Sequence, residues 1–301
     1  MIDFKLKQNI MKKFVCFLFL IFPIIHSFAQ EKPLKILMIG AHPDDCDIKG
    51  GGTAALFAEM GHQVKFISVT NGDAGHMEQG GGILAKRRIT ESYEAGKRLG
   101  ITYDVLDHHD GELEASLPIR LEIIRKIREW EADVVISHRA NDYHPDHRYT
   151  AILVQDAAFM VGVPNIAADT PPLRKNPVFL HFQDNFQKPY PFQPDIAIDI
   201  SSVIDKKMKA LDAHESQFYE WLPWISNDPD PVPEGEVARL AWLKRKRAIG
   251  PNSNVKNTLA KWYGEEKVSA IAFAEAFEIC EYGSRPDQEE IRRLFPMLPK
   301  K

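Results

Sequence analysis

Three features of this 301-residue chain predict an α/β fold with a mainly parallel sheet. Short apolar runs of strand length alternate with longer stretches of helical periodicity, a pattern that favours a parallel sheet with helices on both faces. The chain has no internal repeat and no low-complexity linker. Its roughly 270 residues beyond the N-terminal segment are enough for one large domain with a substantial core.

The expected elements follow one another in a regular order. Strands are expected where β-branched and apolar residues cluster, at residues 34–39, 64–70, 134–137, 178–182 and 196–200. Helices are expected at residues 53–60, 85–99, 117–130, 149–160, 202–214 and 269–282. The glycine runs at residues 50–52 and 80–82 lack the Gly-x-Gly-x-x-Gly spacing of a dinucleotide site, so we interpret them as turns.

Two proline-rich segments, residues 161–177 and 218–257, are expected to elaborate the domain as loops. Pro171-Pro172 cannot extend a helix, and residues 228–233 read Asp-Pro-Asp-Pro-Val-Pro. Tyr219, Trp221 and Trp224 precede that run. Their rings could border a glycan site, or they could cover the core beneath a long loop.

Residues 1–29 are expected to be a secretory signal peptide, with Met11 as a possible true start. A short basic region at residues 11–13 precedes an apolar run at residues 14–25, and Ala29 ends a small-residue cleavage site. The apolar run is too short for an ordinary membrane span, so no stable span is expected after cleavage, although a retained anchor is the alternative. A single domain at residues 30–301 would then act as a secreted or periplasmic protein.

The charge and cysteine content exclude some classes of partner. Loss of residues 1–29 removes four lysines and one aspartate, which changes the net charge from −4 to −7 and disfavours nucleic acid and anionic membrane surfaces. Only Cys46 and Cys280 then remain, too few for a disulfide framework. Cys46 could be a fourth metal ligand, half of one disulfide or, as we favour, a small buried apolar residue. The sequence carries no signal for an oligomeric state.

Two runs carry the chemistry: His-Pro-Asp-Asp at residues 42–45 and His-Pro-Asp-His at residues 144–147. Two imidazoles and one carboxylate, with an open fourth position, make a typical catalytic zinc set, which His42, Asp45 and His147 would supply. Iron, cobalt or manganese also suits these donors. Each run follows an expected strand, and the carboxyl edge of such a sheet is where ligands bind. The sequence therefore predicts a metallohydrolase with its active site at that edge.

Several ordered motifs resemble one family. They are Gly-Ala-His-Pro-Asp-Asp at residues 40–45, Thr-Asn-Gly-Asp at 70–73, Arg-Ile-Thr-Glu at 88–91, the second histidine run, and a fainter Ala-His-Glu-Ser-Gln at 213–217. Together they resemble the PIG-L/LmbE-like zinc-dependent N-deacetylases, which include the deacetylases of N-acetylglucosaminyl-phosphatidylinositol and of sugar precursors of bacterial thiols. The resemblance spans roughly residues 34–217 and implies a Rossmann-like three-layer sandwich.

The resemblance also implies roles for individual residues. It gives the metal to His42, Asp45 and His147, and the part of general base to Asp44. It gives stabilisation of the tetrahedral intermediate to His144, held as an imidazolium by a hydrogen bond that it donates to Asp146. Some members have a tyrosine two residues before the second run, where this chain has Asp142 followed by Tyr143, so the resemblance leaves a tyrosine at the oxyanion site open.

Four further residues are candidates for substrate binding. Arg88 matches a family arginine associated with substrate, although Arg88 and Glu91 could instead form a surface ion pair. Asp73 and Asp110 follow strands or loops at the same sheet edge. His214 lies in the faint late motif and could contact substrate or cap a helix.

The chemistry follows from the weakness of an amide carbonyl as an electrophile. Zinc lowers the pKa of a bound water to about 7 and polarises the carbonyl, while Asp44 could move the proton to the departing amine. The sequence thus predicts a secreted metal-dependent amidohydrolase that removes the N-acetyl group of an amino sugar or glycoconjugate by attack of a zinc-bound water. The alternatives are a zinc deacylase or amidase of another small amide, and a non-catalytic carbohydrate-binding descendant.

Overall fold

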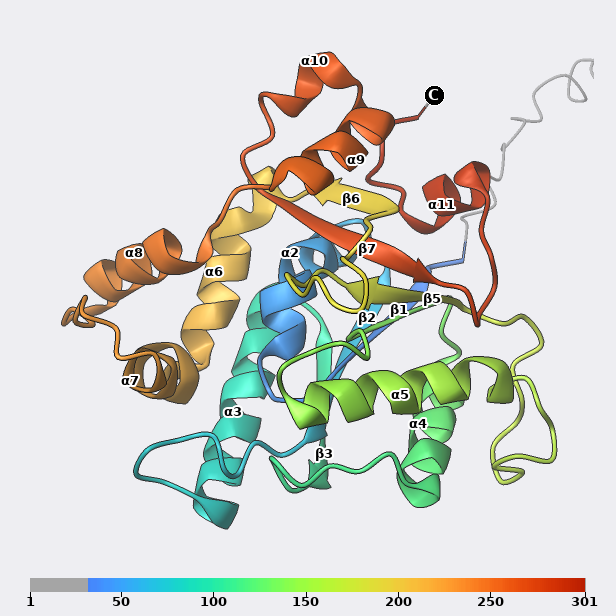
Figure 1. The fold of residues 1–301 in the computed structure, drawn as a ribbon, viewed down its shortest axis with the longest axis horizontal. Coiled ribbons are helices and arrows are strands. Elements are labelled where there is room, and N and C mark those ends of the chain that lie inside the picture. Colours follow the sequence, from blue (N-terminus) through green and yellow to red (C-terminus); the bar gives the residue numbers. More distant parts are fainter. Residues whose placement is uncertain (1–31, 301) are drawn as a thin grey trace, which may run out of the picture. The chain divides into compact units, whose positions relative to one another are not determined.

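A seven-stranded mixed sheet forms the centre of the fold (Figure 1). The computed structural model describes residues 32–300, so the predicted signal peptide lies outside the described residues. The strands lie in the order β3-β2-β1-β4-β5-β7-β6; β7 pairs antiparallel with both β5 and β6, and all other pairs are parallel. They are β1 (Lys35–Gly40), β2 (Gln63–Thr70), β3 (Thr102–His108), β4 (Val134–Ser137), β5 (Val178–Phe182), β6 (Ile196–Asp199) and β7 (Ala274–Cys280).

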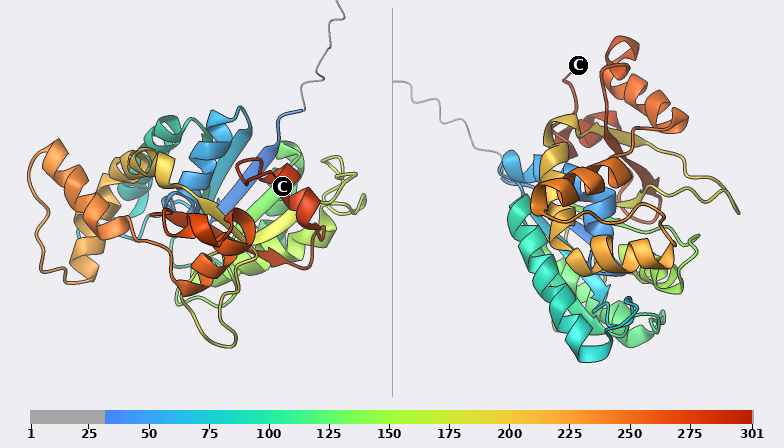
Figure 2. Two further views of the ribbon diagram at one scale, coloured as in Figure 1. Left: turned by 90° about the horizontal axis from the view of Figure 1, so that it is seen from above. Right: turned by 90° about the vertical axis from the view of Figure 1, so that its left-hand side faces the viewer.

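Helices cover both faces of this sheet (Figures 1 and 2). One face carries three mutually packed helices, α2 (Asp45–Glu59), α3 (Gly81–Leu99) and α6 (Ile204–Ala213), and the other carries α4 (Leu117–Trp130) and α5 (Pro145–Met160). The remaining helices are α7 (Leu222–Ile225), α8 (Glu236–Arg247), α9 (Ser253–Tyr263), α10 (Glu265–Val268) and α11 (Gln288–Leu294). The Rossmann-like three-layer α/β class predicted from the sequence is confirmed.

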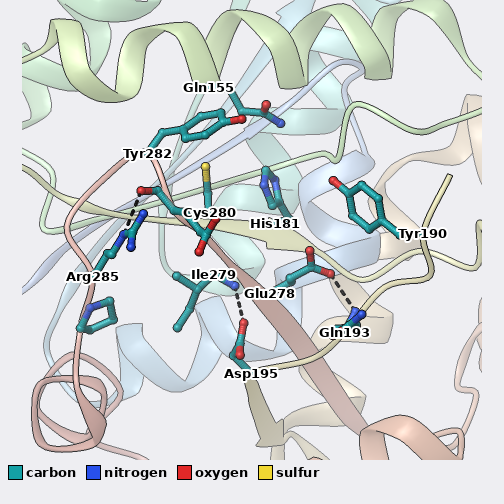
Figure 3. Close-up of a pocket in the computed structure, with 12 residues that line it drawn as sticks. Gln155, His181, Tyr190, Gln193, Asp195, Glu278, Ile279, Cys280, Tyr282 and Arg285 are labelled. Carbon is teal, nitrogen blue, oxygen red and sulfur yellow. Dashed lines mark hydrogen bonds between the residues drawn. The ribbon is translucent and has the colours of Figure 1, made fainter.

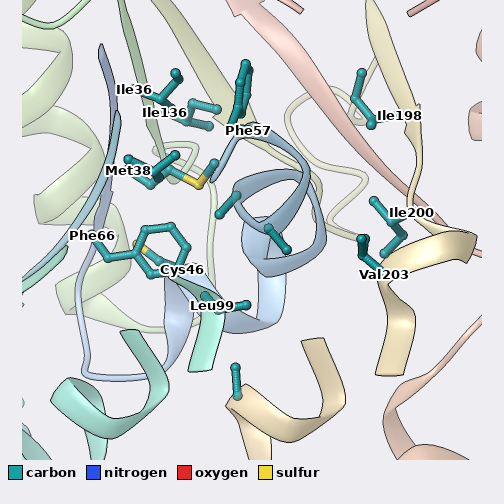
Figure 4. Close-up of a cluster of buried hydrophobic side chains, with 14 of the residues drawn as sticks. Ile36, Met38, Cys46, Phe57, Phe66, Leu99, Ile136, Ile198, Ile200 and Val203 are labelled. Carbon is teal, nitrogen blue, oxygen red and sulfur yellow. The ribbon is translucent and has the colours of Figure 1, made fainter. Parts of the chain in front are cut away.

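Two apolar cores lie on either side of β1. Its alternate side chains point to opposite faces, so Ile36 and Met38 enter the core beneath α2, and Leu37 and Ile39 enter the core beneath α4 and α5. Figure 4 shows Met38 and Phe57 in the first core. A strand buried on both faces has no polar face, which explains why β1 is a continuous apolar run.

The glycine run at residues 50–52 does not form the predicted turn. It lies inside α2, which begins at Asp45. A Cβ atom on Gly52 would come 2.8 Å from Ile200 Cδ1, and one on Gly50 would come 2.5 Å from Met38 Sδ. These glycines therefore let α2 pack closely against the sheet. The second run, residues 80–82, lies at the start of α3.

Neighbouring glycines of α2 should respond oppositely to alanine. Gly52→Ala is expected to lower the free energy of unfolding by about 1–3 kcal/mol because the added methyl overpacks against Ile200. Gly51→Ala meets only Lys207 Cγ at 3.5 Å, so it should raise that free energy by roughly 0.5–1 kcal/mol through helix propensity. Urea unfolding of both variants measures the difference, and equal effects would contradict the packing explanation.

Three other regions differ from the prediction or complete it. Residues 269–282, predicted as a helix, contain strand β7, and β3 had not been predicted. The predicted loop at residues 218–257 contains the end of the π-helix η2 (Ser216–Trp221), then α7, α8 and the start of α9, so residues 226–235 and 248–252 are the parts without regular structure. Residues 161–177 form a loop as predicted.

The described cysteines and helices settle two smaller points. Cys46 and Cys280 are both buried free thiols, which excludes a disulfide between them. Among residues 32–300, no helix combines the length and apolar character needed to cross a bilayer.

Candidate metal and catalytic site

The two histidine runs meet at the point where the strand order reverses. β2, the next strand in the chain, lies on one side of β1. β4 lies on the other side of β1, where Ser137 is opposite Ile39. His42 to Asp45 follow β1, and His144 to His147 follow β4. A crevice outside the carboxyl ends of strands at such a switch point is the usual ligand site of open α/β sheets.

The three predicted metal ligands lie in contact with one another. His42 Nδ1 is 3.1 Å from His147 Nε2. Asp45 Oδ2 is 3.4 Å from His42 Nδ1, and Asp45 Oδ1 is 3.4 Å from His147 Nε2. Tetrahedral coordination at bonds of about 2.0–2.2 Å requires donors roughly 3.4 Å apart. The pairwise spacings suit a zinc-sized cation, although two different oxygens of Asp45 face the two histidines.

Carboxylates fix the outer nitrogens of both histidines. His42 Nε2 lies 3.0 Å from Asp110 Oδ1 and 3.3 Å from Asp146 Oδ2. His147 Nδ1 lies 3.1 Å from Asp142 Oδ1. A carboxylate behind a histidine is the arrangement that orients metal-binding imidazoles, and it leaves the two inner nitrogens facing each other. This arrangement is the second observation that fits a metal.

His138, the residue directly after β4, joins the ligand group. Its ring stacks on His147 at 4.2 Å, and its Nε2 lies 3.2 Å from Asp45 Oδ2. Burial, followed by the neighbouring His147, lowers the pKa of His138 to about 4, so the neutral ring accepts from the Ala41 amide. Burial would raise the pKa of Asp45, but the two histidines hold it well below its ordinary value. The described residues contain three overlapping donor groups: Asp45 with His138 and His147; His42 with His144 and His147; and His42 with Asp110, His144 and Asp146.

Asp44, the predicted general base, occupies a strained position beside the ligands. Its φ of 150° is unusual for a residue with a side chain and costs about 1–3 kcal/mol. Burial raises the pKa of Asp44 to about 6, although Arg88 opposes this shift. A carboxylate with a pKa near neutrality is suited to accept and return a proton.

Arg88 lies behind Asp44 and is almost completely buried. Its guanidinium donates to Gly72 O at 3.1 Å and Pro43 O at 3.2 Å, and Nη2 lies 3.4 Å from Asp44 Oδ1. Nη1 is 3.5 Å from Asp110 Oδ2. These contacts make Arg88 a positioning residue for the loop that carries Asp44; its contact with substrate stays a prediction.

Arg88→Met should therefore destabilise the protein as well as the site. Removal of the cation leaves two buried carboxylates and two carbonyls without their donor, which is expected to cost about 3–5 kcal/mol. Urea unfolding measures this loss. Lys97→Met is a control on the same helix, because the Lys97 side chain is 80 % exposed and lies 3.6 Å from Glu94, so its loss should cost less than about 1 kcal/mol. Equal losses for the two variants would show that Arg88 has no special supporting role.

Asp146 does not hold the His144 side chain, contrary to the prediction. Asp146 accepts from the amides of Gly111 at 2.7 Å and Leu113 at 3.3 Å, and it contacts His42. The Asp146 amide instead donates to His144 Nδ1 at 3.2 Å, because His144 caps α5. Burial and the nearby histidines lower the pKa of His144, which favours the neutral ring. With Nδ1 accepting, the proton of that ring is on Nε2.

The remaining substrate candidates separate into two groups. Asp110 contacts His42, and although burial opposes it, the hydrogen bond with His42 lowers the pKa of Asp110 to about 2. Asp73 accepts from the Asp110 amide and from His109, so it fixes this loop. His214 is fully buried, with Nε2 3.2 Å from Asp47 Oδ2, and in this conformation it cannot touch a substrate. The histidine of the motif at residues 213–217 is therefore an interior residue.

A cavity of about 430 Å³ opens beside the ligand group. Its lining includes His147, Asp142, Tyr143, Phe186, Lys49 and Arg247. Tyr143 is 74 % exposed, and its ring centroid lies 6.3 Å from that of Phe186. We call this cavity the cleft.

A separate cavity of about 520 Å³ lies beside β5 and β7 (Figure 3). Its two central carboxylates are engaged with the backbone: Glu278 accepts from the Gln193 amide and Asp195 from the Ile279 amide, each at 2.7 Å. None of the predicted site residues lines it.

Comparison with known proteins identifies the family. The model of the PIG-L family, described as GlcNAc-PI de-N-acetylase, matches residues 37–158. The diacetylchitobiose deacetylase of Thermococcus kodakarensis is 32 % identical over 215 residues, which cover 68 % of this chain and 79 % of the relative. The chain belongs to the PIG-L family. As a PIG-L deacetylase, it is a hydrolase of amide bonds.

Two further proteins that are similar to this chain carry different names. The solved N,N'-diacetylchitobiose deacetylase of Pyrococcus horikoshii superimposes with a TM-score of 0.61 at 25 % identity, covering 84 % of this chain and 87 % of that one. The 4-oxalmesaconate hydratase of Pseudomonas putida is 25 % identical over 193 residues, which cover 62 % of this chain and 74 % of the relative. The proteins to which this chain is similar are therefore named for two different reactions, deacetylation and hydration.

Proposed function

We propose that this chain is an exported, metal-dependent deacetylase that removes the acetyl group from an N-acetylated amino sugar or glycoconjugate. The observation that carries the proposal is the convergence of His42, Asp45 and His147 next to the buried Asp44, with His147 lining the aromatic-lined cleft. The deacetylases among the relatives support an N-acetylated sugar as substrate. The expected signal peptide at residues 1–29 supports export.

His42, Asp45 and His147 would hold the cation, with zinc as the favoured ion and iron, cobalt or manganese as alternatives. When bound, such a cation supplies Lewis-acid polarisation of the acyl carbonyl and a water of lowered pKa. Asp142, Asp110 and Asp146 keep the two imidazoles in the ligating orientation.

The side chains around the ligands perform the proton and charge steps. Asp44 takes a proton from the attacking water and returns it to the amine nitrogen as the carbon–nitrogen bond breaks. His144 Nε2–H donates to the oxygen that becomes negative in the tetrahedral transition state. Arg88 keeps the Asp44 loop in place throughout.

Aromatic rings on two sides of the site suit the apolar face of a sugar. Tyr143 and Phe186 line the cleft on one side. On the other side, Trp221 lies close to Gly75, because a Cβ on that glycine would be 3.8 Å from Trp221 Nε1. The same Cβ would be 2.9 Å from Arg88 Nη1 and 3.2 Å from Asp110 Oδ2, so Gly75 lies between Trp221 and the site residues. Trp221 stacks on Trp224, whose side chain is largely exposed. The glycan-bordering interpretation of these tryptophans thus gains support.

The test is acetate release by the purified protein from N-acetylglucosamine and diacetylchitobiose, before and after chelation and with zinc restored. Acetate is measured directly because one relative is a hydratase and loss of substrate alone would not define the reaction. Release that is lost with chelator and recovered with zinc is expected. No acetate from these or other N-acetylated sugars, with metal bound, would overturn the proposal.

Export has its own test. Expression of the full chain in a bacterial host should give protein outside the cytoplasm whose N-terminus is residue 30. Recovery of uncleaved protein in the cytoplasm would contradict the export proposal and leave the catalytic one standing.

A further inference from the structure

The loop between β5 and β6, residues 183–195, forms one wall of the cleft. Phe186 lies in this wall, with its ring centroid 6.3 Å from that of Tyr143. Further along the loop, Tyr190 and Gln193 line the separate cavity beside β5 and β7 (Figure 3). The loop contains no helix or strand, so its backbone polar groups depend on side chains or water for partners.

Arg139 holds this loop at two points. It is the second residue after β4, and its side chain is 2 % exposed. Nη1 donates to Asp184 Oδ1 at 3.2 Å, and Nη2 donates to the Tyr190 carbonyl at 2.7 Å. Cζ also lies over the rings of Tyr190 and Phe192, 4.9 and 5.9 Å from their centroids. A planar guanidinium can make both hydrogen bonds and lie against the rings at once, which a lysine ammonium cannot do.

Asp184 connects Arg139 to Phe186. Asp184 Oδ1, the oxygen that pairs with Arg139, also accepts from the Phe186 amide at 3.0 Å. The Asp184 side chain is 5 % exposed, and burial strengthens hydrogen bonds of this kind. Lys49 is the other cation near Asp184, and its Nζ donates to the Gln183 carbonyl at 3.3 Å. The backbone of Phe186 is therefore fixed by two contacts that begin at Arg139.

The backbone of Arg139 is in turn fixed beside the ligand group. Arg139 follows His138, whose ring stacks on His147. The His138 carbonyl lies 3.0 Å from Nδ1 of His181, a residue of β5. Arg139 therefore holds Phe186 at a defined position relative to the metal-type donors.

We propose that Arg139 is a positioning residue that determines how tightly the cleft binds its sugar, because it fixes Phe186 through Asp184. This inference rests on the proposed deacetylase function, since the sugar is the ligand that packs against Phe186. Arg139 is buried behind the cleft wall and acts only through the ring that it positions. Its loss removes binding that is equal in the ground state and the transition state, so KM rises and kcat stays nearly unchanged.

The first experiment measures acetate release from diacetylchitobiose by metal-loaded Arg139→Met. KM is expected to rise about tenfold, whereas kcat should change by less than about threefold. Arg139→Gln/Asp184→Asn leaves no unpaired charge in the interior, and it should give the same result if Arg139→Met does not fold. An unchanged KM, or a fall in kcat without a rise in KM, would overturn the inference while the deacetylase proposal stands.

Arg128→Met is the matched control. Arg128 is also a buried arginine that holds a loop, because it donates to carbonyls of residues 160–170. Those residues do not line the cleft. The control should lower the free energy of unfolding as Arg139→Met does, yet keep the wild-type KM. An equal rise in KM in the two variants would show that loss of stability, and not the position of Phe186, is the cause.

A double-mutant cycle tests whether Arg139 acts through Phe186. Phe186→Ala alone should raise KM about as much as Arg139→Met does, since both variants lose the same wall. Arg139→Met/Phe186→Ala should then raise KM no further than the larger single effect. Multiplicative effects, a rise of about a hundredfold in the double variant, would show that the two residues act independently and would overturn the inference.

Two measurements need no turnover. Hydrogen exchange of the amides of residues 184–190 should be at least about tenfold faster in Arg139→Met than in the wild type or Arg128→Met. Calorimetry with glucosamine, which the enzyme does not hydrolyse, should show binding weakened about tenfold in Arg139→Met alone. If no sugar releases acetate but both changes are observed, the deacetylase proposal fails and the role of Arg139 stands. Unchanged exchange or unchanged glucosamine affinity would overturn that role.

Discussion

Asp44→Asn is expected to lower kcat by roughly 100- to 10,000-fold, the usual contribution of a general acid–base group. Asparagine fills nearly the same volume and tolerates positive φ better than most residues, so the strained turn at φ 150° should persist. Its amide cannot take the proton of the attacking water. The reaction would then lack the group that moves this proton to the amine.

The measurement is acetate release under single-turnover and steady-state conditions, with metal content and the unfolding midpoint as controls. Both controls should stay close to wild type because Asp44 is not one of the three ligands. Asp44→Gly provides a second check: glycine relieves the backbone strain, so this variant should be as inactive but more stable than Asp44→Asn by up to about 1 kcal/mol. Wild-type turnover in either metal-loaded variant would show that Asp44 is not the base.

His147→Ala is expected to have an effect at least as large, for a different reason. His147 faces both other ligands at 3.1 and 3.4 Å, so its loss removes one of three donors. Loss of a second-sphere partner alone typically costs 10- to 100-fold in metal affinity, and loss of a ligand should exceed about 100-fold. Turnover should fall in parallel.

Metal content after dialysis against a defined free zinc concentration measures this directly. His109→Ala is the matched control, because His109 is 70 % exposed at its side chain, contacts Asp73 and belongs to none of the donor groups of the described residues. The control should retain metal. If His147→Ala binds zinc as tightly as His109→Ala does, the ligand assignment is wrong and His138, which lies beside His147, becomes the first alternative.

The sequence predicted four of the parallel strands well, because β1, β2, β4 and β5 are apolar runs with clear boundaries, whereas β3 alternates apolar with polar or charged residues and was missed. Strand β7 was mistaken for a helix, since Phe273 and Phe277 have helical spacing and the element is identified only by its partners β5 and β6. The glycines of α2 suggested a turn for a similar reason. Their small size serves contact with Ile200 and Met38, residues distant in sequence or in another element.

The sequence predicted the site residues whose type is required by the chemistry. It predicted much less well how these side chains are oriented, because their orientation depends on packing. His42, Asp45 and His147 came from their spacing and converge in the structure. The partner of Asp146 could not be deduced, because it depends on how the loop at Gly111 folds over α5. His138 could have been identified as a site residue from its position directly after β4. Nothing in the sequence identifies His214 as an interior residue, because that depends on its ion pair with Asp47.

The order of strands also determines when the sheet can assemble. β7 is the last strand in the chain, yet it lies between β5 and β6, so β6 has no place in the sheet until residues 274–280 arrive. An incomplete chain on the ribosome therefore keeps the outer edge of β5 open, and long-range pairing of this kind is slow to form. For a protein that leaves the cytoplasm by threading through a membrane channel, as proposed here, late closure is useful: the chain completes its sheet only after its final segment has followed the rest across.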